Sequence, residues 1–450
     1  MATVCIGAFM GQLDASIVTL AFPTLTRTFD ASLGSVQWVG LSYLLVLVSL
    51  LTAIGRAADM LGRKLLYTYG FVIFIVGSAL CGLAPSLGAL VAFRALQGLG
   101  AAMLQANSVA IIVNAVPRER LGRAIGVQGA AQALGLALGP AVGGLLIGLG
   151  GWRLIFLVNV PAGIAGAVLG WFLLPRSRQL AERTRFDWLG LGLFIPAASA
   201  LLLAISYGNQ LGWLSPATLG LLAASLGLAV AFVGRERGAA APMLDLGLFR
   251  RAQFSAGIAS GLLSYLVLFG VLLIVPFLLQ DAQHRSPGAT GVELMLMPLS
   301  LGIVAAVSGR LAERLGVRAL TVTGMVLVAL VLVLLGLADA DHAVFLIGLG
   351  LIGAGLGAFT PPNNAAIMGS VPGHQTGMAS GVLNMTRGFG TALGLALTGL
   401  VFTLAAGPHA IDRGFTAAAI FLAAVALAAA GLSALRGRAA LSRDPTLTAE

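Results

Sequence analysis

Charged side chains are scarce in this sequence. Asp, Glu, Lys and Arg make up 9% of the 450 residues, whereas a typical soluble domain carries about 25%. Hydrophobic residues make up 58%, and the mean hydropathy is +0.99. The composition therefore predicts an integral membrane protein with no room for a separate soluble domain.

Cysteine and histidine are also rare. The two cysteines, Cys5 and Cys81, each lie inside an apolar run, which does not indicate a disulfide framework. The four histidines fall in connections between apolar segments and are far apart in the sequence, unlike the clustered ligands of a metal site. We expect no bound metal.

The features of nucleotide-binding and nucleic-acid-binding proteins are missing. The net charge is +10, but no basic run with interleaved aromatic residues predicts a nucleic-acid partner. No phosphate-binding loop of the Walker type occurs, and the glycines at 348, 350 and 353 lack the strand and the acidic residue that a dinucleotide site needs. We therefore expect no cofactor, and we do not expect ATP as an energy source.

Long hydrophobic runs dominate what is present. Fourteen apolar segments are long enough to cross a bilayer, at 2–25, 35–55, 66–84, 89–113, 124–149, 154–174, 188–208, 216–234, 254–279, 290–308, 319–338, 343–369, 376–404 and 415–435. The first has no basic leader and an acidic residue in its middle, so we interpret it as a retained span rather than a cleaved signal. Its nearly absent polar tail leaves a truncated start open.

The basic residues fix the expected orientation. Twenty of the 26 lie in connections on the side of the N-terminus, and four lie in connections on the other side. Because positive charge marks the cytoplasmic side, both termini are predicted to be cytoplasmic. Arginine outnumbers lysine 25 to 1, which suggests a GC-rich bacterial genome and hence the cytoplasmic membrane of a bacterium.

An internal repeat divides the chain. The sequence GRAADMLGRK at 55–64 recurs as GRLAERLGVR at 309–318, and ALGLAL at 133–138 returns at 392–397. An even number of spans separates the copies, so they form a parallel repeat with a substrate site expected between them. We predict a six-helix half at 1–174, two linking helices at 175–252, a second six-helix half at 253–435 and a cytoplasmic tail at 436–450.

At these motifs the chain resembles the major facilitator superfamily, and in particular its fourteen-span drug/proton antiporter branch, the QacA/EmrB-like group. The resemblance implies an all-α membrane fold of two six-helix halves plus two extra central helices. The conserved cytoplasmic connection of that superfamily, a gating loop, is matched by Gly55, Asp59, Gly62, Arg63 and Lys64, and by Gly309, Glu313 and Arg314 in the repeat. A solvated loop is the alternative interpretation.

Two charged residues stand out inside the first half. Asp14 is the only acidic residue clearly in the middle of a span, and it matches the first-span aspartate of the fourteen-span branch. Arg94 matches the family's fourth-span arginine, and a charge at that depth costs at least about 2.5 to 3.5 kcal/mol without a partner or water. We predict that Asp14 carries the proton and that Arg94 modulates it. A structural hydrogen bond or a snorkelling arginine is the alternative.

The fifth span resembles the antiporter signature of the superfamily's exporters. Its members are Gly135, Gly139, Pro140, Gly143 and Gly144. Glycines at intervals of four permit close helix contact, and Pro140 favours a bend. The resemblance indicates export, although ordinary packing of small residues would give the same spacing.

Polar residues at helical spacing predict a central cavity. The predicted lining residues are Gln97, Gln105, Ser108, Gln128, Gln132, Asn384 and Arg387.

These features together predict a monomeric, proton-coupled exporter of small amphipathic or cationic compounds, that is, a multidrug efflux carrier. An exporter of a lipid, sugar or secreted metabolite, or an importer of the same fold, remains an alternative. An intramembrane enzyme would need a catalytic pair or metal ligands near one interface, and a channel would need charged rings or a carbonyl filter.

Overall fold

The computed structural model describes residues 1–117, 121–174, 187–239, 242, 246–337, 341–371, 376–406 and 411–435. The predicted C-terminal tail at 436–450 lies outside the described residues, as do the start of the predicted linking region and several of the arginine-rich connections.

Every secondary-structure element among the described residues is a helix. Its first part contains α1 (Ala2–Phe29), α2 (Leu33–Val36), α3 (Trp38–Leu61), α4 (Arg63–Gly82), α5 (Leu87–Ala115), α6 (Leu121–Gly150), α7 (Leu154–Leu157) and α8 (Asn159–Leu173). The remaining helices are α9 (Trp188–Leu211), α10 (Pro216–Gly238), η2 (Leu248–Arg250), α11 (Ala252–Phe277), η3 (Leu278–Ala282), α12 (Pro287–Leu315), α13 (Val317–Leu337), α14 (His342–Gly369), α15 (Thr376–Ala406) and α16 (Ile411–Ala434).

Fourteen helical segments among the described residues are long and apolar enough to cross a membrane, as the sequence predicts. Several helices continue past the apolar run that identified them; α12, for example, extends to Leu315 instead of ending near residue 308. A helix can leave the hydrocarbon layer without ending, because its backbone hydrogen bonds are satisfied within the helix. Hydropathy therefore predicts the membrane-spanning segments but not the full lengths of the helices.

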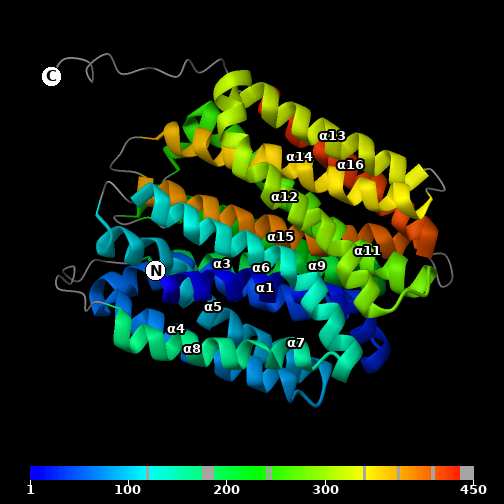
Figure 1. Ribbon diagram of the computed structural model, residues 1–450, viewed down its shortest axis with the longest axis horizontal. Helices are drawn as coiled ribbons and strands as arrows, with labels where there is room; N and C mark the ends of the chain where they lie inside the picture. The colour runs from blue at the N-terminus through cyan, green and yellow to red at the C-terminus, as the bar shows by residue number, and fades with distance from the viewer. Residues whose placement is uncertain are drawn as a thin grey trace.

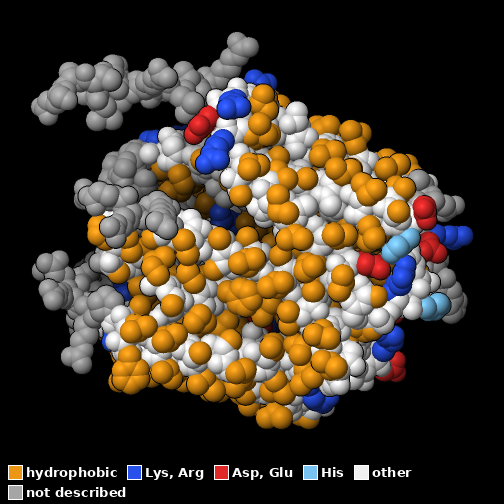
Figure 2. Space-filling model, viewed as in Figure 1, with side chains coloured by type: hydrophobic (Ala, Val, Ile, Leu, Met, Phe, Trp, Pro, Cys, Tyr) orange, Lys and Arg blue, Asp and Glu red, His pale blue; other side chains and the backbone are white. Residues whose placement is uncertain are grey.

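The surface is apolar between the ends of the helices. Figure 2 shows hydrophobic side chains over the middle of the molecule, with most of the charged side chains near the helix ends. Large apolar side chains are exposed here, such as Phe172, which is 76% exposed. In water such a surface would be unfavourable, so lipid is its solvent.

The helices form two bundles that lie side by side (Figure 1). We call α1 and α3–α8 the N-terminal bundle and α11–α16 the C-terminal bundle. The bundles meet mainly where α6 packs on α12, α3 on α15 and α1 on α11. Helix α10 packs on α9, and α9 contacts both α3 and α15. The predicted boundaries between a first half, a linker and a second half stay a prediction.

The two repeated motifs are helical almost to their ends. Residues 55–61 belong to α3, and α4 begins at Arg63, so the turn between them consists of Gly62 alone, with φ 104°. In the repeat, α12 ends at Leu315 and Gly316 makes the matching turn with φ 86°. The interpretation of these segments as loops is therefore wrong for the backbone, because polar residues here continue the helices. The side chain of Asp59 is not among those described.

We predict different effects of substitution at two glycines of this motif. Gly316 has φ 86° and ψ 143°, which a residue with a Cβ adopts at a cost of about 1 to 3 kcal/mol. Gly316→Ala should therefore lower the melting temperature of the purified protein in detergent. Gly309→Ala is the matched control, because Gly309 lies within α12 and a Cβ there meets open space. Equal melting temperatures for the two variants would contradict this account of the turn.

Candidate functional site

The two charged residues singled out in the sequence form a buried ion pair. Asp14 lies near the middle of α1 and is 0% exposed, and Arg94 lies on α5 and is 1% exposed. Arg94 Nη1 donates a hydrogen bond to Asp14 Oδ2 at 2.6 Å. Either charge buried alone in the membrane interior would be costly in free energy, and the ion pair reduces that cost for both.

Two amides complete the surroundings of the carboxylate. Asp14 Oδ1 accepts hydrogen bonds from Gln97 Nε2 at 2.9 Å and from Asn159 Nδ2 at 3.0 Å. With the bond from Arg94, all three partners of the carboxyl group are N–H donors. This arrangement suits the ionised form, which accepts hydrogen bonds and donates none.

The Arg94 guanidinium also has several partners besides Asp14. Arg94 Nε donates to the backbone oxygen of Val39 at 2.8 Å, and Nη1 also donates to Gln97 Oε1 at 2.6 Å. The Arg94 guanidinium carbon lies 4.2 Å from the centroid of the Tyr43 ring, within cation–π range. Gln97 Nε2 reaches on to Ser78 Oγ at 2.7 Å. The cluster thus ties together α1, α3, α4, α5 and the start of α8.

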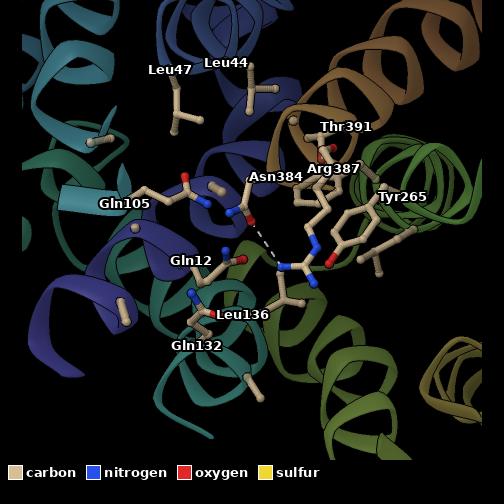
Figure 3. A pocket seen from close by; sticks show the side chains of 18 of the residues that line it. Gln12, Leu44, Leu47, Gln105, Gln132, Leu136, Tyr265, Asn384, Arg387 and Thr391 are labelled. Atoms are coloured by element: carbon tan, nitrogen blue, oxygen red, sulfur yellow. Dashed lines mark hydrogen bonds between the residues drawn. The ribbon is translucent and has the colours of Figure 1, made fainter. Parts of the chain in front are cut away.

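A cavity of about 320 Å³ lies between the two bundles. Its size is within the range of sites for drug-sized ligands. Its wall is mostly apolar, and its polar lining residues come from both bundles: Gln12, Tyr43, Gln105, Ser108, Gln132, Ser264, Tyr265, Thr360, Asn364, Asn384, Arg387 and Thr391. Figure 3 shows Gln12, Gln105 and Gln132 on one side and Tyr265 and Arg387 on the other.

The structure separates the predicted cavity residues into two groups. Five of them line the cavity: Gln105, Ser108, Gln132, Asn384 and Arg387. Gln97 does not line it, because its side chain is buried in the ion-pair cluster. Gln128 does not line it either; it is 3% exposed and donates to Ser108 Oγ at 2.6 Å from behind the wall. Asp14 and Arg94 are likewise absent from the cavity wall.

Four residues that the sequence analysis did not single out belong to these sites. Tyr43 lines the cavity and lies over Arg94, so it separates the cavity from the ion pair. Asn159 bonds Asp14, and Gln12 and Tyr265 line the cavity. An amide in an apolar span was a usable signal for Gln12 and Asn159. No comparable signal marked Tyr43 and Tyr265, since an aromatic residue in a span usually packs against its neighbours.

The bundles touch closely at the end of the molecule away from the N-terminus. Gln37 Nε2 donates to the backbone oxygen of Leu395 at 2.7 Å, and Gln280 Nε2 donates to that of Leu20 at 3.3 Å. Arg27 and Asp281 form an ion pair at 3.9 Å across the same boundary. We call this region the closed end.

The cavity lies toward the opposite end, which contains the N-terminus. Its lining includes Gly7 and Gly11 from the first half of α1, and Gly129 from the first third of α6. A Cβ added at Gly126 or Gly129 would meet open space. Helix α6 therefore packs on α12 near the closed end, but at Gly126 and Gly129, toward the N-terminal end, it has no such close neighbour.

The glycines of the predicted antiporter helix have two different neighbours. Gly135, Gly139 and Gly143 face α1, where an added Cβ would collide with the Phe9 backbone, the Ser16 side chain and the Ile17 side chain respectively. Gly144 instead lies against the backbone of Pro287 in α12. Helix α6 therefore contacts α1, which contains Asp14, on one face and the other bundle on the next face, and Pro140 lies close to Gly291 of α12.

Comparison with known proteins agrees with this architecture. The family model described as Major Facilitator Superfamily matches residues 4–270 and 257–448. Multidrug resistance protein Stp of Mycobacterium tuberculosis (strain CDC 1551 / Oshkosh) is 37% identical over 88% of this chain and 74% of its own. Riboflavin transporter RibZ of Clostridioides difficile (strain 630) is 34% identical over 87% of this chain and 85% of its own.

A solved structure shows the same fold. The inward-facing, occupied crystal structure of a bacterial homolog to the human lysosomal transporter Spinster matches with a TM-score of 0.71 and 16% sequence identity. The match covers 96% of this chain and 95% of that one. These likenesses identify an integral, multi-pass membrane transporter and not an enzyme.

We predict that Gly139→Leu prevents normal transport while the protein still inserts. The larger side chain would displace α1 at Ser16, two residues from Asp14. The matched control is Gly148→Leu on the same helix, where an added Cβ meets open space. Substrate flux in proteoliposomes containing equal amounts of protein measures the effect. Equal flux for the two variants would show that close contact with α1 is dispensable.

We also predict that the ion pair behaves as a unit in stability measurements. Arg94→Ala leaves a buried carboxylate without its cation and should cost about 3 to 5 kcal/mol of folding stability. Adding Asp14→Asn removes the stranded charge. The double variant should therefore lose less folding stability than the two single variants lose in sum. Thermal unfolding in detergent of the four proteins of this cycle measures the coupling. Strict additivity would mean that the two residues do not stabilise each other.

Proposed function

The chain belongs to the major facilitator superfamily, and on this premise we propose that it is a proton-coupled secondary exporter of small amphipathic compounds. The proposal places it in the cytoplasmic membrane of a bacterium with both termini in the cytoplasm. It acts as a monomer of the fourteen-span antiporter branch, without a cofactor, by alternating exposure of the cavity to each side. The single observation that carries the proposal is the buried Asp14–Arg94 pair beside the cavity.

The ion pair supports a proton-carrying role because its geometry depends on charge. A proton on Asp14 would neutralise the acceptor of three hydrogen bonds and weaken the attraction to Arg94. Since those bonds join several helices, a change at Asp14 alters the packing of α1 against α5 and α8. Protonation is thereby linked to the relative stability of two arrangements of the bundle.

Tyr43 supplies the contact between substrate and proton site. Tyr43 lines the cavity, and its ring also lies over the Arg94 guanidinium. A compound that displaces Tyr43 would remove the cation–π contact of Arg94 and expose the pair to the cavity. Substrate binding and proton release would then compete for the same group of side chains, which is the requirement for exchange of one for the other.

The position of the cavity supports loading from the cytoplasm. The cavity lies toward the end with the N-terminus, which the distribution of arginines predicts to be cytoplasmic. The closed end would separate it from the outside until the bundles rock. Export is further supported by the name of Stp, a multidrug resistance protein, and by the glycine-rich face of α6 against α1.

The energetics of one proton are adequate. Each charge that crosses about 100 mV gains roughly 2.3 kcal/mol, which supports a concentration ratio of about fifty for a neutral compound before any pH difference is added. A single carboxylate is therefore sufficient for concentrative export.

We predict that Asp14→Asn abolishes substrate-linked proton release. Asparagine keeps the shape of the side chain but does not titrate, so binding of neutral compounds should persist while coupling disappears. Asp14→Glu should retain part of the activity. The measurement is the change in pH on adding substrate to the purified protein in weakly buffered detergent.

The matched control is Asp412→Asn, which removes an exposed acidic residue at the start of α16 and should leave proton release unchanged. Undiminished, pH-dependent uphill transport by Asp14→Asn would place the proton site elsewhere. Transport direction in inside-out vesicles separates the exporter from an importer, and a riboflavin arm tests the alternative of a metabolite carrier that the name of RibZ raises.

A further inference from the structure

Arg387 has an uncompensated charge inside the cavity. It lies on α15, lines the cavity, and points its guanidinium toward the middle of the pocket (Figure 3). Within the described part of the chain its side chain makes one hydrogen bond, which is long, from Nη1 to Asn384 Oδ1 at 3.5 Å, and its buried Nε has no partner. Among the described residues, no carboxylate forms an ion pair with it.

The other arginine within a span shows what a satisfied guanidinium looks like here. Arg94 has a carboxylate, a backbone oxygen and an amide oxygen within 2.8 Å. Arg387 has none of these at such distances, although a cation at membrane depth is costly unless water or an anion compensates it. Its fork of N–H groups is therefore available to a ligand, and that fork matches carboxylate, sulfonate and phosphate groups.

The rest of the wall has no negative charge to offer a cation. The described lining residues include no Asp, no Glu and no second basic residue. The polar groups opposite Arg387 are the neutral amides Gln12, Gln105 and Gln132 (Figure 3). A cationic compound in this cavity would meet one positive charge and no counter-charge, which gives no support to the cationic substrates expected from the sequence.

Aromatic side chains share the cavity wall with Arg387. The Arg387 guanidinium carbon is 5.8 Å from the centroid of the Tyr265 ring, and Phe269 and Tyr43 also line the cavity. These surfaces suit a flat apolar body whose acidic group reaches Arg387. We propose that the cavity selects amphipathic aromatic anions, with Arg387 binding the acidic group and Tyr265 contacting the ring. This inference rests on the proposed function only in taking the cavity as the transport site.

The test compares two probes that share one aromatic scaffold. Anilinonaphthalene sulfonate is an anion, and N-phenylnaphthylamine is the same framework without the sulfonate. Binding of each to the full chain in detergent is measured by equilibrium dialysis against empty micelles of the same composition. The wild-type protein should bind the sulfonate at least about tenfold more tightly than the neutral compound, the size of effect expected for a charge-assisted contact.

Substitution assigns that preference to one side chain. Arg387→Gln should remove the preference while binding of the neutral probe stays within about twofold of wild type, and Arg387→Lys should retain part of it because the charge remains. Arg413→Gln is the matched control, since Arg413 is an exposed arginine near the start of α16 and is not part of the cavity wall. This control should bind both probes as wild type does.

Three outcomes would overturn the proposal. An intact preference in Arg387→Gln would place the anion elsewhere, and an equal loss of both probes would make Arg387 a packing residue. Tighter binding of the cation ethidium than of the sulfonate would reverse the assigned charge. The assay needs neither a proton gradient nor a transport direction, so the anion preference can hold where proton release fails, and can fail where proton release holds.

Discussion

The ion pair between Asp14 and Arg94 is the constraint on which the N-terminal bundle depends. A carboxylate or a guanidinium alone in a membrane interior is expensive, and together they are tolerable only if their remaining hydrogen-bonding groups are satisfied. That requirement brings α3, α4 and α8 to the pair, through Val39, Ser78 and Asn159. The amide of Gln97 connects the acid, the base and α4 at once.

Close helix packing makes this network geometrically accessible. An added Cβ at Gly77 of α4 would collide with the backbone of Gln97, and one at Gly139 of α6 would collide with Ser16 near Asp14. Small residues on α4 and α6 therefore let neighbouring helices approach the two helices that contain the charges. The glycine pattern and the buried charges are separate motifs in the sequence, but in the structure both belong to the packing around the Asp14–Arg94 pair.

Much of this could be predicted from the sequence because a charge in the membrane interior is costly without a partner or water. Asp14 and Arg94 stood out as charges within apolar spans, and the fourteen candidate spans followed from hydropathy. Helical spacing gives the face of a residue and not the neighbour that this face meets. Gln97 and Gln105 were therefore assigned to one cavity, whereas the structure places Gln97 in the ion-pair cluster and Gln105 in the cavity.

What the sequence could not supply is the tertiary partner of an ordinary residue. Tyr43 matters because its ring lies between the cavity and Arg94, a relation that requires α3 to pack on α5. Likewise, Arg94 and Arg387 are both arginines inside spans. Arg94 is paired with Asp14, whereas the buried Nε of Arg387 has no partner among the described residues. The difference depends on whether a carboxylate from another helix lies opposite, which no local pattern encodes.

The charge of the substrate decides how strongly the membrane potential drives the proposed exchange. When one proton enters and a monovalent cation leaves, no net charge crosses the membrane, and only the pH difference drives transport. When a monovalent anion leaves instead, two charges cross in the favourable direction, which at about 100 mV corresponds to roughly 4.6 kcal/mol. Arg387 faces the cavity with no carboxylate partner among the described residues, and Asp14 is paired with Arg94 outside the cavity. This arrangement favours the cycle that gains most from the membrane potential.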